Sequence, residues 1–245
     1  MKTNSYDQDV GILVIDDHAI SRHFTYEALR QFSKNIRHAR TGHEAISTTR
    51  NWFPGLIYTD IHLPDTSGLS LVQEIRSAWP QERNLPHIIV ITGDSSPQLI
   101  QRAKQADIAG ILLKPVRMED IRASAQQLIQ LDSNVRENPM QDPGAAINQE
   151  LRELFSRELN TRLPSLDGFI SQLDWLPAGE ILHQLIASSA MCREKELENC
   201  SRVLYQAISA NPEPKTIAQT YHPFLRAASQ TKMHLSPVCK NPDHT

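Results

Sequence analysis

Five polar side chains each stand at the end of a short apolar run in the first half of the chain. Asp16 and Asp17 follow the first run, Asp60 ends a later one, and Thr92 and Lys114 close two more. Ligands of open α/β sheets bind beside the carboxyl ends of the strands. If the runs are parallel strands, we expect three carboxylates, a hydroxyl and an amine to meet at one edge of a sheet.

This set of side chains predicts a site for a divalent cation and a phosphoryl group. Neighbouring carboxylates repel one another unless a cation compensates, and oxygen ligands favour a hard ion such as Mg²⁺. With the cation bound, an ionised Asp60 can attack phosphorus in line, while Lys114 and Thr92 neutralise charge on the equatorial oxygens. A single Asp after a strand is usually a turn or cap residue, so the prediction rests on all five residues occurring together.

The first half alternates between apolar runs and helix-compatible stretches, which predicts five βα units. Three of the runs are almost continuously apolar, as buried parallel strands are, whereas the run at 36–40 is polar at alternate positions and suits an edge. Such units form an α/β doubly wound parallel sheet with right-handed crossovers. The expected strands lie at about 11–15, 36–40, 56–59, 87–92 and 110–113, and the expected helices near 20–32, 43–52, 69–78, 97–106 and 118–131.

The second half shows helical periodicity only, with apolar residues three and four positions apart. Several prolines fall at the starts of the expected segments, where proline is tolerated. Helical segments joined by short loops predict an antiparallel bundle. The expected segments lie near 146–162, 164–174, 178–192, 194–210 and 214–231, and the prolines are residues 164, 177, 212 and 214.

We therefore expect two domains. Residues 133–145 are polar and contain two prolines and a glycine, which is typical of a linker. This linker would join an α/β domain at 8–132 to an all-α helical-bundle domain at 146–232. The last residues, 233–245, carry two more prolines among mixed polar residues and are expected to form a disordered tail.

Composition narrows the possible classes of function. The net charge is -3, and residues 1–132 carry 14 basic and 15 acidic side chains while residues 133–245 carry 11 and 13. Neither half has the basic excess of a protein that binds nucleic acid or an anionic membrane. The three cysteines form no CxxC pair, and no apolar run approaches 18 residues. These features predict a cytoplasmic protein without a metal cluster or a disulfide framework.

Residues 10–131 resemble the receiver domain of two-component response regulators, a flavodoxin-like fold. The matching residues are Asp16-Asp17, Asp60 within Asp-Ile-His-Leu-Pro-Asp-Thr-Ser-Gly, and the pairs Thr92-Gly93 and Lys114-Pro115. The resemblance implies that Asp60 is the phosphoacceptor. It also implies that Asp16, Asp17 and Asp60 bind Mg²⁺ together with the backbone carbonyl of His62.

By the same resemblance Thr92 and Lys114 sense the phosphoryl group. The family usually places a Tyr or Phe three positions before the lysine, and this aromatic ring moves inward with the Thr. Here that position is Ile111. We therefore expect phosphorylation to be coupled less tightly to the outer face around Ile111.

Residues 146–231 resemble histidine phosphotransfer (HPt) domains. Their pattern centres on a helical His followed by small residues one turn on, which leaves the imidazole accessible; here the His is His183. Without the resemblance, a single helical His is more often an ordinary surface or core residue, and small residues also permit close helix packing. The other matching positions are Asp174, Trp175, Leu185, Ala187, Ser188, Ser189 and Leu197.

The HPt pattern is incomplete in this chain. The family favours Lys, Gly and Gly at positions now held by Ile186, Ala187 and Arg193. Ala187 is small enough to let a partner aspartate approach. Arg193 or Lys195 is a candidate to replace the missing lysine charge.

Two functions follow as alternatives. In the first, the protein is a non-enzymatic phosphorelay carrier: a sensor histidine kinase or its HPt domain phosphorylates Asp60, and His183 exchanges phosphate with Asp60 or with a second receiver downstream. In the second, it is a phosphorylation-gated adaptor whose HPt-like bundle docks partners without carrying phosphate. A DNA-binding regulator is disfavoured because no helix-turn-helix signature is present. Neither alternative involves nucleic acid or a membrane.

Overall fold

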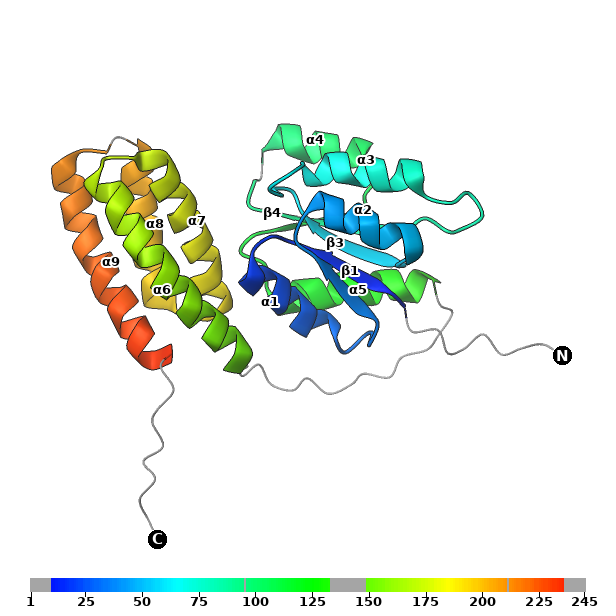
Figure 1. Cartoon of the computed structure of the whole chain (residues 1–245), viewed down its shortest axis with the longest axis horizontal. Coiled ribbons are helices and arrows are strands. Elements are labelled where there is room, and N and C mark those ends of the chain that lie inside the picture. The colour runs from blue at the N-terminus through cyan, green and yellow to red at the C-terminus, as the bar shows by residue number, and fades with distance from the viewer. Residues whose placement is uncertain (1–9, 95, 133–148, 211, 236–245) are drawn as a thin grey trace, which may run out of the picture. The chain divides into compact units, whose positions relative to one another are not determined.

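The computed structural model describes residues 10–94, 96–132, 149–210 and 212–235. The chain divides into two compact units, Met1–Pro143 and Gly144–Thr245 (Figure 1). The expected linker at 133–145 lies outside the described residues, as do 8 and 9 of the first expected domain. Among the described residues, no helix is both long enough and apolar enough to cross a bilayer.

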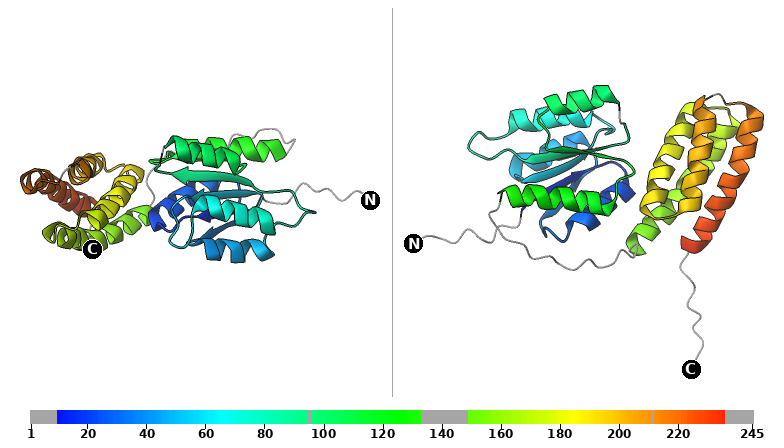
Figure 2. Two further views of the ribbon diagram at one scale, coloured as in Figure 1. Left: turned by 90° about the horizontal axis from the view of Figure 1, so that it is seen from above. Right: turned by 180° about the vertical axis from the view of Figure 1, so that it is seen from behind.

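The first unit is a five-stranded parallel sheet with the strand order β2-β1-β3-β4-β5. Helices α1 and α5 cover one face, and α2, α3 and α4 cover the other (Figures 1 and 2). This is the predicted doubly wound fold. Its elements are β1 (Ile12–Ile15), α1 (Ala19–Leu29), β2 (Ile36–Ala39), α2 (Gly42–Asn51), β3 (Leu56–Asp60), α3 (Gly68–Ala78), β4 (His87–Thr92), α4 (Pro97–Gln105), β5 (Gly110–Leu113) and α5 (Met118–Asp132).

Burial explains why some strands are apolar throughout and one is not. Every residue of β1 and β3 is buried, because helices cover both faces of these inner strands. Strand β2 lies at the edge of the sheet, as predicted, and leaves its polar residues Arg37 and His38 exposed. The buried Tyr58 of β3 donates its hydroxyl to the Ile121 carbonyl at 3.2 Å, which ties the sheet to α5.

The second unit consists, within residues 149–210 and 212–235, of four long helices packed as a bundle (Figures 1 and 2). Buried Phe155 and Leu159 of the first helix and Phe224 of the last contribute to its core. Tyr221 donates its hydroxyl to Asp167 at 2.9 Å and joins the same two helices. The helices are α6 (Gln149–Ser171), α7 (Trp175–Met191), α8 (Lys195–Ala210) and α9 (Pro214–Leu235).

Two boundaries in this half differ from the sequence prediction. The expected break at Pro164 is wrong, because α6 continues through that proline. Leu159 and Leu166, on either side of it, are both fully buried, so packing holds one continuous helix despite the proline. Helix α9 also extends to Leu235, into the segment expected to be a tail; residues 236–245 lie outside the described part of the chain.

Candidate phosphoryl and cation site

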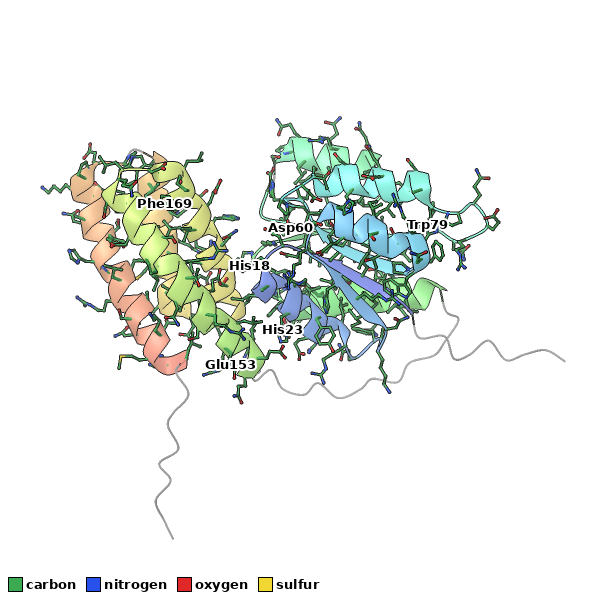
Figure 3. The ribbon with its side chains drawn as sticks, in the orientation of Figure 1. His18, His23, Asp60, Trp79, Glu153 and Phe169 are labelled. Carbon is green, nitrogen blue, oxygen red and sulfur yellow. The ribbon has the colours of Figure 1, made fainter. Side chains whose placement is uncertain are left out.

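The three carboxylates predicted from the strand ends lie together in the structure. Strands β1 and β3 pair in parallel with Ile15 opposite Thr59, so Asp16, just after β1, and Asp60, the last residue of β3, leave the sheet side by side. One carboxylate oxygen from each of Asp16, Asp17 and Asp60 falls in a group whose members are all within 4.8 Å of one another. Asp16 and Asp60 are buried, whereas Asp17 is exposed. Figure 3 labels Asp60 and His18 at this edge of the sheet.

Lys114, directly after β5, points into the same group. Its ammonium lies 2.5 Å from Asp60 Oδ2 and 3.4 Å from Asp16 Oδ2. Burial lowers the pKa of Lys114, but the negative charges of Asp16 and Asp60 outweigh that effect and raise it, so the lysine stays protonated. Burial also raises the pKa of Asp16, while the charge of Lys114 opposes this rise. The peptide bond between Lys114 and Pro115 is cis.

The donor set suits a hard divalent cation. Three carboxylates face one lysine ammonium, which leaves an excess of negative charge that a single monovalent side chain does not balance. The three carboxylates offer oxygen atoms as ligands, the type of ligand atom that Mg²⁺ prefers. The residues present therefore fit the predicted cation.

His62 and Thr92 complete the edge of the site. The His62 amide donates to Asp60 Oδ1 at 3.2 Å, which fixes the carboxylate; that the His62 carbonyl binds the cation stays a prediction. Thr92, the last residue of β4, is fully buried, and its hydroxyl accepts a hydrogen bond from the Asp94 amide at 3.0 Å. The Lys114 amide donates to the Thr92 carbonyl at 2.7 Å, so these two residues are joined through the backbone.

Sequence reasoning missed two residues that hold the loop after Asp60. Gly68 opens α3 so close to β3 that a Cβ there would lie 2.2 Å from the Asp60 carbonyl oxygen. Asp65 accepts hydrogen bonds from the amides of Gly42 and His43 and so caps α2 from the neighbouring loop. These two hydrogen bonds lower the pKa of Asp65. The sequence signal for both residues is the run Asp65-Thr66-Ser67-Gly68, which ends in a residue with no side chain to clash with β3.

Arg22 is a third residue that sequence reasoning missed. Its guanidinium donates from α1 to the carbonyl of Asp16 at 2.7 Å and to that of Asp17 at 3.3 Å. These bonds fix the backbone that carries two of the three acids. Its spacing, six residues after Asp16, places it on the first turn of the following helix and gives no other signal in the sequence.

In the second unit, His183 lies exposed on α7. Its ring packs beside the ring of Tyr205 on α8, with centroids 6.1 Å apart and planes tilted by 49°. Gly179, one turn before His183, lies beside the same tyrosine: a Cβ built on it would be 3.7 Å from Tyr205 Cε2. The imidazole therefore stands on the surface shared by α7 and α8.

Contrary to our expectation, not all of the small residues after His183 lie beside the imidazole. Ala187 is partly exposed, but Ser188 and Ser189 are fully buried. Ser188 donates its hydroxyl to Glu158 Oε2 at 2.7 Å, so it faces α6 rather than the surface. The expectation that Ser188 lies beside the accessible ring is wrong, because this hydrogen bond turns it toward the bundle interior.

The two cations suggested as substitutes for the missing lysine lie at and beyond the turn that follows α7, and their role stays a prediction. Helix α7 ends at Met191, and Arg193 follows it in the turn to α8 with a φ of 61°. At 1.5 Å per helical residue, the end of α7 at Met191 lies about 12 Å along the helix axis from His183, and Arg193 follows that end. Lys195 is the first residue of α8, on the other side of the same turn.

A comparison with known protein families matches residues 12–126 to the response regulator receiver domain. These residues therefore form a receiver domain. The helical unit that follows is not covered by this match.

Several curated proteins are similar to parts of the chain. Sensor histidine kinase AruS of Pseudomonas aeruginosa is 25% identical over 193 residues, which cover 72% of this chain and 19% of the kinase. Transcriptional activator protein ExaE of Pseudomonas putida is 29% identical over 67% of this chain and 79% of its own length. The CAI-1 autoinducer sensor kinase/phosphatase CqsS of Vibrio cholerae is 31% identical over 42% of this chain and 15% of its own. The chain thus spans less than a fifth of either sensor kinase.

Solved structures similar to the chain cover about half of it. A CheY-like receiver domain protein of Methanospirillum hungatei has 23% identity and a TM-score of 0.46, and covers 52% of this chain and 100% of its own. A CheY-like receiver domain of Methylobacillus flagellatus has 22% identity and a TM-score of 0.45, and covers 49% of this chain and 99% of its own.

Proposed function

We propose that this protein is a phosphorelay carrier, in which Asp60 accepts a phosphoryl group and His183 exchanges phosphate with a receiver aspartate. The observation that carries the proposal is the joint placement of Asp60, Asp16, Asp17 and Lys114 at one sheet edge. We further propose that a sensor histidine kinase or its HPt domain is the upstream donor. A second receiver is the proposed downstream partner of His183. In this proposal the protein acts as a signalling carrier rather than an enzyme with a turnover of its own.

Each residue of the site has a defined task in phosphorylation. The ionised Asp60 carboxylate supplies the electron pair that forms the new oxygen–phosphorus bond, and the bond to the donor breaks on the opposite side. Lys114, held by Asp60 and Asp16, lies where it can move onto a phosphoryl oxygen as charge develops. The Thr92 hydroxyl, which accepts from the Asp94 amide, still has its own proton to donate to another phosphoryl oxygen.

The carboxylates of Asp16 and Asp17, with Asp60, are the proposed ligands for Mg²⁺. The cation, when bound, offsets the negative charge that an incoming phosphoryl group adds to an already acidic site. Arg22 keeps the backbone of Asp16 and Asp17 in place for this purpose.

Two observations support a relay role for the second unit. His183 is exposed on a long helix, so a partner domain can reach its imidazole. The similarity to sensor histidine kinase AruS covers 72% of this chain, more than the first unit, Met1–Pro143, can supply, so it extends into the helical unit. A neutral imidazole near pH 7 is a competent nucleophile for phosphorus.

The alternative proposal is a docking module that carries no phosphate. It is favoured by Ile186, which is buried where the HPt pattern has lysine, and by Ser188, which bonds to Glu158 instead of flanking the ring. In this alternative the helical unit binds partners when Asp60 becomes phosphorylated. A DNA-binding role has less support: although the similarity to ExaE also extends past the first unit, the described helices of this unit are 16 to 23 residues long, unlike the short pair of a helix-turn-helix.

Two phosphate donors applied to the full chain test the proposal. Labelled acetyl phosphate should place alkali-labile label on the wild-type chain, and Asp60→Asn or a chelator should abolish it. Labelled phosphoramidate should place alkali-stable label on the Asp60→Asn chain, and His183→Gln should remove it. His222→Gln, at an exposed position on α9, is the matched control for the histidine.

The outcomes separate the two proposals. Alkali-stable label that requires His183 supports the relay. Label on Asp60 alone, with none on His183, favours the docking module. Undiminished acetyl phosphate labelling of the Asp60→Asn chain would refute the assignment of the phosphoacceptor.

A further inference from the structure

Helix α7 exposes His183 but offers little else that could hold a phosphoryl group beside it. Ile186, close to one turn on, is 8% exposed and has no charge. Ser188 is turned toward Glu158, and Arg193 lies beyond the end of the helix. A phosphoryl group on His183 carries negative charge, and the neighbouring helix α8 is a further source of cations and hydrogen-bond donors.

Tyr205 on α8 lies against this part of α7. Its ring packs at 6.1 Å from the His183 ring, centroid to centroid, and also lies beside Gly179. The tyrosine ring therefore lies along α7 between Gly179 and His183. The phenol carries an O–H donor at the end of a rigid ring. It can therefore orient the imidazole and donate to an oxygen of a group bound there.

Arg202 stands three residues before Tyr205, so the two side chains share one face of α8. Helices α7 and α8 are joined by a short turn and run antiparallel, as Figures 1 and 2 show. Residues of α7 and α8 that are about equally far from this turn therefore lie at the same level along the two helices. Arg202 thus lies nearer to the turn than Tyr205, on the same face of α8 and at the level of the part of α7 that follows His183.

The guanidinium of Arg202 is already oriented. Its Nη2 and Nε lie 2.7 and 3.2 Å from Glu198 Oε1, and 42% of its side chain is exposed. This ion pair engages only part of the fork, because guanidinium has five N–H donors. Arginine forks match the oxygens of a phosphoryl group in charge and geometry.

We propose that α8 supplies the residues that hold a phosphoryl group on His183: Tyr205 as the positioning residue for the imidazole and Arg202 as the cation that contacts the phosphoryl oxygens. The inference rests on the proposed relay function of His183. In the step itself, a ring nitrogen of His183 forms the nitrogen–phosphorus bond. The donor's bond to phosphorus breaks with its electron pair, and the imidazole keeps its proton on the other nitrogen. Arg202 replaces the charge that the pattern of α7 lacks at Ile186.

The test measures the rate of alkali-stable labelling by phosphoramidate in full-length Asp60→Asn chains. Tyr205→Phe keeps the ring but removes the O–H donor and should slow labelling about fivefold. Tyr205→Ala removes the ring as well and should slow it more. Arg202→Gln removes a charge-assisted contact and should slow labelling about tenfold, and Arg202→Lys should recover part of the loss. The controls are Gln206→Ala, at the next and exposed position of α8, and Arg226→Gln, exposed on α9.

A second readout separates positioning from a general loss of structure. The imidazole resonances of His183 should shift in Tyr205→Ala, because the neighbouring ring is lost, while the thermal midpoint of the helical unit stays close to that of the Gln206→Ala control. Wild-type labelling rates in both Tyr205→Ala and Arg202→Gln would overturn this inference and leave the relay function standing. Absence of His183 label in the parent chain would instead refute the relay function, and the inference with it.

Discussion

Gly68 packs directly against the backbone carbonyl of Asp60, and a Cβ at Gly68 would lie 2.2 Å from that oxygen. The amide of Gly68 also donates to the Ile61 carbonyl at 2.7 Å. The start of α3 is thus held against the residue that ends β3. The position of the Asp60 carboxylate depends on this close approach as well as on the residues that contact the carboxylate itself.

Gly68→Ala should therefore disturb the site without touching any charged group. The new methyl group cannot coexist with the Asp60 carbonyl, so α3 has to shift, and we expect the receiver to lose about 1–3 kcal/mol of unfolding free energy. Acetyl phosphate labelling of Asp60 should slow as well. Urea unfolding followed by circular dichroism measures the first effect. Gly110→Ala is the control, because a Cβ there meets no atom within 4 Å; equal stability of the two variants would contradict the prediction.

Asp65→Ala should destabilise the receiver in a pH-dependent way. The variant loses the two hydrogen bonds that cap α2, which by comparison with other helix caps costs about 1 kcal/mol at neutral pH. The pKa of Asp65 is lowered in the folded protein, so its stabilising effect is complete above the pKa of the unfolded chain and disappears as pH falls through the lower, folded value. The difference in unfolding free energy between wild type and variant should thus shrink below about pH 4.

Thermal unfolding of both proteins between pH 3 and pH 7 measures that difference. Asp94→Ala is a useful comparison, since Asp94 has a pKa lowered by its own Ser96 contact and does not cap α2. A gap between wild type and Asp65→Ala that stays constant over the whole range would argue against the capping role.

Magnesium should stabilise the first unit through its carboxylate cluster. A cation that binds only the folded chain raises the thermal midpoint as its concentration rises above its dissociation constant. Asp60→Asn removes one of the three carboxylates. Each 10-fold increase in Mg²⁺ concentration should therefore raise the thermal midpoint of this variant less than that of the wild type. Differential scanning calorimetry with and without chelator checks the prediction. The control Asp107→Asn alters an exposed acid outside the cluster. An equal rise of the thermal midpoint with Mg²⁺ in all three proteins would contradict the prediction.

Ile111 should report phosphorylation weakly. The residue lies in β5 opposite Val90 and is partly buried. Its branched aliphatic side chain is shorter than an aromatic ring and moves less between a buried and an exposed position. A phosphate mimic bound at Asp60 should shift the backbone amide resonances of Thr92 and Lys114 strongly and those near Ile111 less. Heteronuclear NMR of the full chain measures all three. A rearrangement at Ile111 as large as that at Thr92 would show that a branched aliphatic side chain transmits the signal after all.

The sequence alone determined the sheet and the contents of the first site. Strand ends of one parallel sheet meet at one edge, so the positions of Asp16, Asp60 and Lys114 after apolar runs were sufficient to bring them together. The supporting contacts of Gly68 and Asp65 were not predictable in the same way. They depend on how closely α3 and the loop before it approach other segments, and that distance is set by packing.

Helix boundaries in the second half show the limit of local reasoning. An interior proline costs roughly 3 kcal/mol, which favoured a break at Pro164. Burial of Leu159 and Leu166 in the same bundle outweighs that cost, and α6 continues. Propensity is a property of a few neighbouring residues, whereas this burial depends on helices that are distant in the sequence.

The surroundings of His183 were decided by the tertiary structure. Its exposure could be predicted from the helical pattern, but the direction of Ser188 is fixed by Glu158, 30 positions earlier. The neighbour of the imidazole is Tyr205, on a different helix. Helical spacing relates residues three and four apart but gives no information about the neighbouring helix. Only the packing of α7 against α8 could bring these two rings together.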